Sequence, residues 1–394
     1  MSHSYLYQSL IGLAGLLCCL LPCSAQDTRV VPGDERTEIY LPMLEGKRVA
    51  VFSNHTGVVN GQHLLDLLLE EGVDVTAIFS PEHGFRGGAD AGAHVDSSAD
   101  PQTGIPILSL YDGKSRKPSA ATMRKFDLLL VDIQDVGLRF YTYYITLCRL
   151  MDACAEHGRR VVILDRPNPN GHYVDGPLLD MKLKSGVGWL PIPIVHGMTL
   201  GELARMVNGE RWLPQGRVCP LTVVPCLNYT HQTRWELPIA PSPNLPDMKS
   251  VYLYPSTCLF EGTPVSLGRG TDRPFQVYGH PRMKGCSYSF TPVSRPGAKN
   301  PPLEGQRCWG VDLSRLSDEA IWQAGVNLHY VIDAYHRMGQ PEGFFRRFFD
   351  QLAGVDYVSR MIKEGKRADE IKACWAKDVE QFKRQRRPYL LYEE

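Results

Sequence analysis

The chain has no excess of either charge, because 43 Lys and Arg residues balance 43 Asp and Glu residues over 394 positions. A nucleic-acid-binding protein usually shows a basic face or stripe, so we predict no nucleic-acid partner. The one local basic run, 383–387, is interpreted as the solvated face of a charged helix. After residue 25, no apolar run is long enough to span a membrane.

Signatures of metal and nucleotide sites are also missing. The sequence contains no Cys-x-x-Cys, His-x-x-x-His or His-Glu-x-x-His spacing, and such spacings are typical of zinc sites. No Gly-x-Gly-x-x-Gly loop follows the first apolar run, and the Gly-rich stretch 262–275 lacks the Gly-Lys-Ser/Thr ending of a phosphate-binding loop. We therefore predict neither a metal nor another cofactor.

The N-terminus is typical of an export signal. Residues 10–21 are apolar, and Cys23-Ser24-Ala25 supplies small residues before a cut ahead of Gln26. We predict a signal peptide at 1–25 and export to the periplasm or the cell exterior. A lipid anchor on one of the three cysteines in this segment is the less favoured alternative.

Eight cysteines remain after that cut, and export permits disulfides. Cys219 and Cys226 flank one short apolar run and could pair across a turn or bulge. Buried free thiols are the alternative, and the sequence leaves both open.

Between residues 47 and 164, strand-like apolar runs alternate with helix-like segments, as in a parallel sheet covered on both faces. We expect strands near 48–52, 73–79, 105–110, 128–133 and 161–164, and helices at 64–69 and 142–157. Thr199, with Glu202 three residues later, has the spacing of a capping box at a helix start.

A Pro-rich stretch at 238–246 predicts a stiff, extended segment and a domain boundary. The predicted fold class is α/β, with a catalytic domain at 26–240 and a smaller α+β domain at 241–394. In the second domain we expect short strands near 251–253 and 286–291, followed by helices from 318 to the end.

Polar clusters directly follow four of the apolar runs, at 53–57, 80–87, 132–135 and 165–168. The carboxyl ends of parallel strands share one edge of a sheet, and ligands bind in the crevice there. We therefore expect one site at this edge, with candidate residues Asn54, His55, Glu82, His83, Arg86, Asp132, Gln134 and Asp135.

Glu82 is the first candidate for catalysis, because partial burial of a carboxyl on a strand-end loop raises its pKa, as a general acid needs. Taken alone, a loop Glu that caps a helix or pairs with Arg86 is the simpler interpretation, but the neighbouring clusters favour catalysis. Asp132 and Asp135 are the next carboxyls, and paired carboxyls are the usual equipment of glycoside hydrolysis. A structural role for Asp132 in bonding a neighbouring loop is an equal alternative.

Arg139 lies close to Tyr141 and Tyr143 in the sequence. Aromatic faces can stack on sugar rings, and a planar guanidinium grips a carboxylate at two points. We therefore include all three as candidates for substrate binding. A helix start packed on the sheet, with an Arg at the surface, is an equal alternative.

The Gly-rich stretch supplies the last candidates, Glu261, Arg269 and Thr271. Glycines let the backbone approach a ligand closely, and Arg269 could bind an anion. A plain turn is the alternative.

Together these motifs resemble the NamZ family of exo-β-N-acetylmuramidases, glycoside hydrolases that act on peptidoglycan fragments. The matching segments occur in order through most of the chain after residue 25, at 80–87, 132–143, 165–169, 196–202, 241–246 and 260–271. The resemblance implies a Rossmann-like larger domain, a smaller C-terminal domain and a cleft between them. It also implies removal of terminal N-acetylmuramic acid from the non-reducing end of peptidoglycan-derived muropeptides or disaccharides.

The resemblance implies that Glu82 is the catalytic glutamate, acting as general acid/base. We extend it with two hypotheses: Arg139 or Arg269 binds the lactyl carboxylate of the sugar, and Asp132 or Asp135 assists catalysis. The acetamido group of the sugar could also act as nucleophile, and the sequence does not choose between these routes.

Two other functions are consistent with the residues. One is an exported metal-assisted hydrolase, such as a deacetylase or phosphoesterase, that uses His55, Glu82, His83 and Asp132. The other is a non-catalytic sugar-binding protein with a cleft between two lobes. Without the resemblance, the residues indicate only an exported α/β hydrolase or binding protein, and the oligomeric state stays open.

Overall fold

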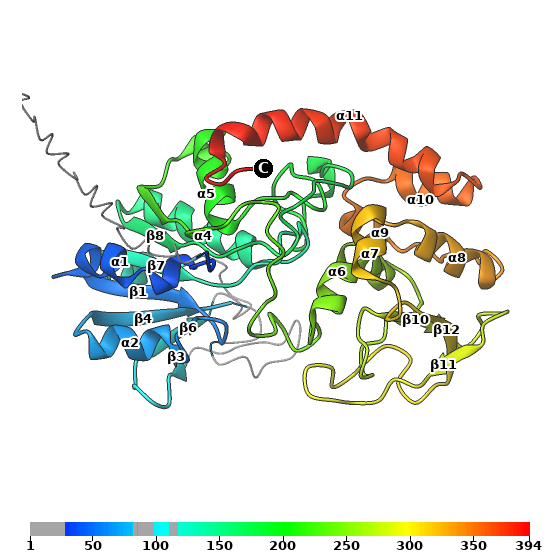
Figure 1. The fold of residues 1–394 in the computed structure, drawn as a ribbon, viewed down its shortest axis with the longest axis horizontal. Coiled ribbons are helices and arrows are strands. Elements are labelled where there is room, and N and C mark those ends of the chain that lie inside the picture. The colour runs from blue at the N-terminus through cyan, green and yellow to red at the C-terminus, as the bar shows by residue number, and fades with distance from the viewer. Residues whose placement is uncertain (1–27, 82–84, 86–97, 110–116) are drawn as a thin grey trace, which may run out of the picture.

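The structure is a computed structural model, and it describes residues 28–81, 85, 98–109 and 117–394. Two lobes lie side by side in it, as Figure 1 shows. The first contains the large sheet, and the second contains a small sheet with several helices. The α/β architecture with two domains is therefore confirmed.

The large sheet has the strand order β5-β6-β4-β1-β7-β8-β9 within the described residues. All neighbours pair in parallel except β5 (Ser98–Ala99), which lies antiparallel at one edge. The chain moves outward from β1 in one direction and then, from β7, in the other, as in Rossmann-like sheets. The parallel strands are β1 (Arg48–Ser53), β4 (Asp74–Ser80), β6 (Pro106–Ser109), β7 (Leu128–Asp132), β8 (Arg160–Leu164) and β9 (Leu221–Val224).

Helices cover both faces of this sheet, which explains why its strands are apolar without interruption. Successive side chains of a strand point to opposite faces, so Val49 and Val51 of β1 pack with α1 (Thr37–Leu44) and α2 (Leu64–Glu70). Ala50 and Phe52 join the larger core under α3 (Ala120–Met123), α4 (Tyr143–Glu156) and α5 (Leu200–Gly209). A short hairpin of β2 (Val58–Val59) and β3 (Gln62–His63) follows β1.

The predicted strand at 251–253 was wrong, because these residues lie inside helix α6 (Met248–Thr257). Asp247 caps this helix by accepting the Ser250 N–H at 2.8 Å. The helix is buried on all sides from residue 250 to 257. Its apolar residues therefore show no helical period, and a short continuous apolar run is easily mistaken for a strand.

The second domain continues with an antiparallel sheet of order β10-β12-β11, which confirms the strand expected near 286–291. The sheet strands are β10 (Val277–His280), β11 (Tyr288–Phe290) and β12 (Cys308–Asp312). The helices that follow are α7 (Asp318–Ala324), α8 (His329–Arg337), α9 (Arg347–Ala353), α10 (Tyr357–Lys363) and α11 (Ala368–Arg386).

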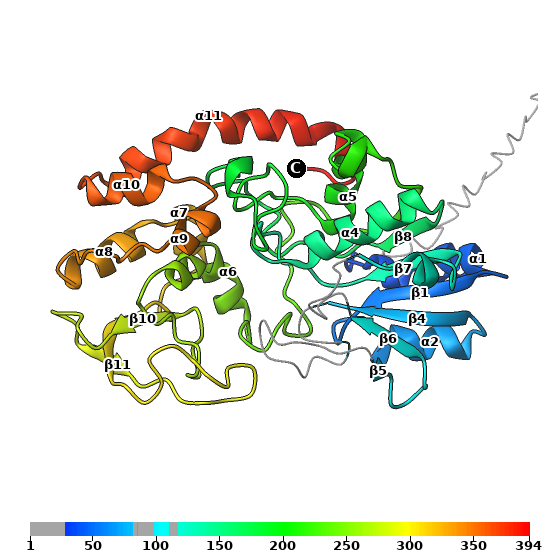
Figure 2. The ribbon, with the colours of Figure 1, turned by 180° about the vertical axis from the view of Figure 1, so that it is seen from behind.

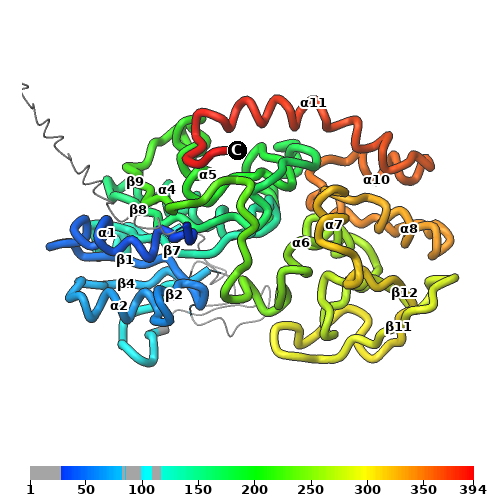
Figure 3. Tube along the Cα trace, viewed as in Figure 1, coloured from blue at the N-terminus to red at the C-terminus, as the bar shows by residue number. Residues whose placement is uncertain are grey.

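Helix α11 extends across both lobes and returns the C-terminus to the first one, as the tube in Figure 3 and the opposite view in Figure 2 show. The tail beyond it is hydrogen-bonded there. The Tyr392 hydroxyl donates to Asp165 at 2.6 Å, and the His231 N–H donates to the carbonyl of Glu393 at 2.8 Å. The last residues of the chain therefore belong physically to the first domain.

The eight cysteines in the described part of the chain are free thiols, including Cys219 and Cys226. The pairing of these two that the sequence left open is therefore not formed. Among the described residues, no helix is both long and apolar enough to cross a membrane.

Candidate active site

The carboxyl ends of β1 and β7 lie side by side at the point where the strand order reverses. Ser53 at the end of β1 pairs with Asp132 at the end of β7. Just beyond them, the Thr56 hydroxyl donates to Asn54 Oδ1 at 2.6 Å and accepts the Gln134 N–H at 3.1 Å. The structure thus brings Asn54, Asp132 and Gln134 together at the edge where ligands bind in such sheets.

This edge is hydrogen-bonded to the Pro-rich segment that leads into the second domain. The Tyr141 and Tyr143 hydroxyls donate to the carbonyl of Pro241 at 2.9 and 3.3 Å. The Asn54 amide in turn donates to the Tyr143 hydroxyl at 3.1 Å. The two tyrosines therefore hold the boundary segment against the sheet edge.

His55 and Gln134 also bond to loop carbonyls. His55 Nε2 lies 2.9 Å from the carbonyl oxygen of Ala240, so this nitrogen carries the proton. The Gln134 side-chain amide donates to the carbonyls of Asp135 and Pro167 at 2.8 and 2.9 Å. These bonds position the loops around the edge, and contact of either residue with a substrate stays a prediction.

Asp132 is paired with an arginine that sequence reasoning did not select. Arg166 donates from Nε and Nη2 to the two oxygens of Asp132 at 2.5 and 3.0 Å, and from Nη2 to Asp34 at 2.6 Å. All three side chains are buried. Burial raises the pKa of Asp34 to about 7. The structure therefore supports the structural alternative for Asp132, whose two oxygens are both engaged.

Asp135 has a different environment. Its Oδ1 accepts the Gly137 N–H at 2.7 Å, whereas its buried Oδ2 has no hydrogen-bond partner among the described residues. Burial raises the pKa of this carboxyl from 3.8 to about 7. Asp135 is thus the aspartate of the pair that can exchange a proton near neutral pH.

Arg139 is completely buried, and its guanidinium donates hydrogen bonds to backbone carbonyls of both domains. It donates to Pro177 and Ile192 in the first domain at 2.6 and 2.9 Å. It also donates to Leu352 and Ala353, at the carboxyl end of α9, at 3.0 and 2.7 Å. Burial lowers its pKa to about 10. Arg139 therefore joins the two domains, and neither the substrate role nor the surface alternative agrees with this position.

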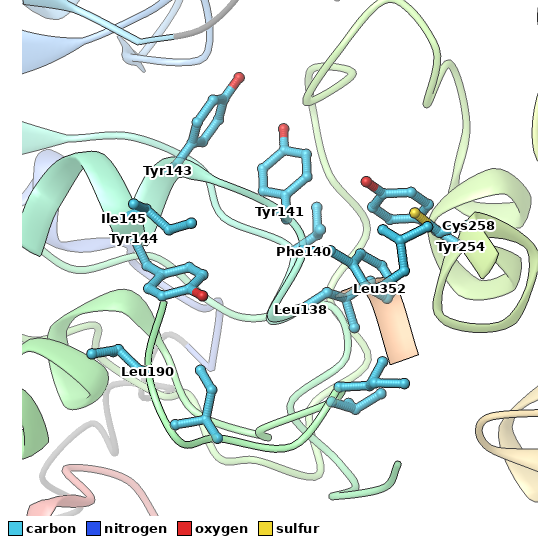
Figure 4. Close-up of a cluster of buried hydrophobic side chains, with 14 of the residues drawn as sticks. Leu138, Phe140, Tyr141, Tyr143, Tyr144, Ile145, Leu190, Tyr254, Cys258 and Leu352 are labelled. Carbon is cyan, nitrogen blue, oxygen red and sulfur yellow. The ribbon is translucent and has the colours of Figure 1, made fainter. Parts of the chain in front are cut away.

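A cavity of about 750 Å³ lies between the two domains, within the size range of small-molecule sites. Figure 4 shows part of its aromatic wall, with Tyr141 and Tyr143 from the first domain and Tyr254 from α6. The ring centres of Tyr141 and Tyr254 lie 6.3 Å apart, and those of Tyr254 and Phe275 lie 4.7 Å apart. Tyr254 was missed: it directly follows the residues, 251–253, that were expected to form a strand.

Glu261 and Arg269 form an ion pair in the cavity wall. Arg269 donates from Nη2 to Glu261 at 2.7 Å, and its guanidinium carbon lies 5.0 Å from the Phe275 ring centre. Gly268 before it has a φ of +86°, which an L side chain rarely adopts. Thr271 instead donates to the Gly268 carbonyl at 2.7 Å, as in a plain turn.

Glu82, His83 and Arg86 lie outside the described residues, so their predicted roles stay predictions. Phe85 between them is described and is buried against the His63 ring at 4.8 Å. Within the residues that the structure describes, no three His, Cys, Asp or Glu side chains converge as metal ligands would.

Comparison with known proteins assigns both domains. Residues 49–249 match the family model "Exo-beta-N-acetylmuramidase NamZ, N-terminal", and residues 252–392 match its C-terminal counterpart. The chain is 38% identical over 374 residues to the peptidoglycan beta-N-acetylmuramidase NamZ of Bacillus subtilis (strain 168), covering 90% of this chain and 89% of that protein.

Crystal structures of two DUF1343 family proteins from Bacteroides fragilis NCTC 9343 have the same architecture. The first is 66% identical, with a TM-score of 0.88, and the match covers 93% of this chain and 99% of that one. The second is 30% identical, with a TM-score of 0.75 and coverage of 93% and 100%. With both domains matched by its models, the chain belongs to the exo-β-N-acetylmuramidase NamZ family.

Proposed function

We propose that this protein is an exo-acting β-N-acetylmuramidase that releases terminal N-acetylmuramic acid from the non-reducing end of peptidoglycan fragments. The observation that supports it most is the cavity between the two family domains, which is lined by aromatic rings and the Glu261–Arg269 pair. Aromatic rings suit sugar faces, and a guanidinium suits a sugar that carries a carboxylate.

In this proposal Glu82 is the general acid/base. The support is the place of β4, which ends at Ser80, two positions before Glu82, and lies next to β1 in the sheet. Asp135 is the better second carboxyl, because both oxygens of Asp132 are bonded to Arg166. His83 would assist from the same loop as Glu82.

The test is release of free N-acetylmuramic acid from the disaccharide MurNAc-GlcNAc, followed by mass spectrometry. We expect release by the wild type, with and without EDTA, and loss of more than about 100-fold in Glu82→Gln. Glu45→Gln, which changes an exposed glutamate after α1, is the matched control and should keep full activity. No release by the wild type would refute the proposed activity, and loss with EDTA alone would support a metal-assisted hydrolase.

We also propose that residues 1–25 are a signal peptide and that the mature protein acts outside the cytoplasm, where peptidoglycan lies. The support is the apolar run at 10–21 followed by small residues before Gln26. Mass analysis of the protein from fractionated cells should find a chain that starts at Gln26. A chain that retains Met1, or one that carries lipid on a cysteine, would contradict this proposal.

A further inference from the structure

We propose that Arg269 binds the lactyl carboxylate of N-acetylmuramic acid and thereby selects this sugar over N-acetylglucosamine. The inference rests on the proposed function and adds the residue that sets its specificity. The two sugars differ by the lactyl ether on O3, whose carboxylate is ionised at neutral pH. A cation at the substrate site would favour the sugar that carries this carboxylate.

Three cationic side chains line the cavity among the described residues: Arg269, Lys299 and Arg346. Lys299 and Arg346 are exposed, whereas the Arg269 side chain is only 21% exposed. A charge–charge contact is weakened by water and salt at an exposed position and much less at a partly buried one. Arg269 is thus the cation best placed to discriminate between a charged and a neutral sugar.

The guanidinium of Arg269 is already held in place. One of its donors is engaged by Glu261 at 2.7 Å, and its plane lies near the Phe275 ring. Glu261 is the one hydrogen-bond acceptor for this group among the described residues. A fixed guanidinium loses little conformational entropy on binding and keeps its other donors for a ligand.

Arg269 can donate hydrogen bonds to a second carboxylate while it is paired with Glu261. The same molecule contains such an arrangement at the sheet edge, where Arg166 bonds to both Asp132 and Asp34 at 2.5–3.0 Å. Those three side chains are buried, and Arg166 there already binds two carboxylates. The Glu261–Arg269 pair has only one carboxylate and borders the cavity, so the position of the second carboxylate is open to a ligand.

The aromatic wall leads to this position. Rings follow one another from Tyr141 through Tyr254 to Phe275, with centres 6.3 and 4.7 Å apart. The guanidinium carbon of Arg269 lies over the Phe275 ring, 5.0 Å from its centre. Phe275 is 1% exposed and Tyr254 8%, so a sugar would contact this wall at Tyr141 and Tyr254 and reach the guanidinium with a substituent of its ring.

The test compares kcat/KM for the 4-nitrophenyl β-glycosides of N-acetylmuramic acid and N-acetylglucosamine. We expect Arg269→Gln to lower the value for the first substrate by about 10- to 100-fold, the usual effect of removing a hydrogen bond to a charged group. The value for the second substrate should change by less than about threefold. Arg269→Lys keeps the charge but not the planar group that can bind a carboxylate at two points. It should recover part of the preference for N-acetylmuramic acid.

Removing the charge from the substrate instead of the protein provides a second test. The methyl ester of the lactyl carboxylate should lower kcat/KM of the wild type by about the same factor as Arg269→Gln, and it should lower that of Arg269→Gln no further. Arg346→Gln is the matched control and should leave the preference between the sugars unchanged.

Three results would overturn the inference. They are an equal loss on both glycosides in Arg269→Gln, a preference that collapses in Arg346→Gln, and an ester that the wild type cleaves as well as the acid. If the wild type releases nothing from the N-acetylmuramic acid glycoside, the proposed function fails and this inference fails with it. Release with an unchanged preference in Arg269→Gln refutes the inference alone.

Discussion

Two aspartates three positions apart show how environment decides what a residue can do. Both carboxylate oxygens of Asp132 accept hydrogen bonds from Arg166. One buried oxygen of Asp135, in contrast, has no hydrogen-bond partner among the described residues. The sequence predicted both as catalytic and could not distinguish them, because Arg166 lies 34 positions further along the chain. Only the register of β7 and β8 brings Arg166 to Asp132.

The raised pKa of Asp135 makes stability depend on pH. Because the pKa of Asp135 is about 7 in the folded state, well above the 3.8 of an unperturbed aspartate, the folded protein binds the proton more tightly than the unfolded chain does. The stabilisation that this raised pKa gives the folded state is present in full below the unfolded-state pKa and is lost as the pH rises toward 7. Asp135→Asn keeps an acceptor for Gly137 but does not titrate.

We therefore expect the free energy of unfolding of the wild type, minus that of Asp135→Asn, to fall between pH 5 and pH 7 by roughly 1 kcal/mol per pH unit. Urea unfolding across this range measures it, and Asp74→Asn, at an exposed position in β4, is the control. A difference that stays constant with pH, or rises, would show that Asp135 is ionised in the folded protein.

Among the helices and strands, the most specific prediction that the structure confirms came from a short sequence pattern. The capping box at Thr199 is formed: its hydroxyl accepts the Glu202 N–H, and the Glu202 side chain accepts the Thr199 N–H. This cap also has a tertiary role, because the Thr199 hydroxyl donates to Asp165 at 2.6 Å. Helix α6 was missed for the opposite reason, since its burial on all sides removes the helical period.

The double role of Thr199 predicts the cost of removing it. Thr199→Ala loses the cap of α5 and a hydrogen bond to a buried carboxylate, so we expect about 2–3 kcal/mol of destabilisation. Ser317→Ala, which removes the cap of α7 alone, should cost about 1 kcal/mol. Equal losses in urea unfolding would mean that the bond to Asp165 contributes nothing.

At the scale of the whole molecule, Arg139 and the C-terminal tail connect the two domains. Gly354 allows the Arg139 contact, because a Cβ there would lie 2.4 Å from the guanidinium. Its φ of +82° also suits glycine. The backbone conformation at the end of α9 thus fits a buried arginine that lies 215 positions earlier in the chain.

Removing Arg139 should therefore destabilise the protein strongly. Arg139→Gln leaves buried carbonyls without donors, and we expect a loss of about 3 kcal/mol or more. Arg160→Gln, at an exposed position at the start of β8, should change stability by less than about 0.5 kcal/mol. A loss as small as this in Arg139→Gln would remove the domain-joining role.

The sheet edge could be predicted, because apolar runs with polar ends are local patterns that parallel strands bring together. The partners of Arg139 and Arg166 could not, because a guanidinium is compatible equally with a substrate, a carbonyl cluster or an aspartate until the fold places it. The cavity wall was recognised only in part, through Tyr141, Tyr143, Glu261 and Arg269.

The most direct test is the crystal structure of the Glu82→Gln protein with MurNAc-GlcNAc bound. We predict the disaccharide in the cavity between the domains, its N-acetylmuramic acid ring against Tyr254 and its lactyl carboxylate within hydrogen-bonding distance of Arg269. A disaccharide bound outside this cavity would contradict the assignment of the active site.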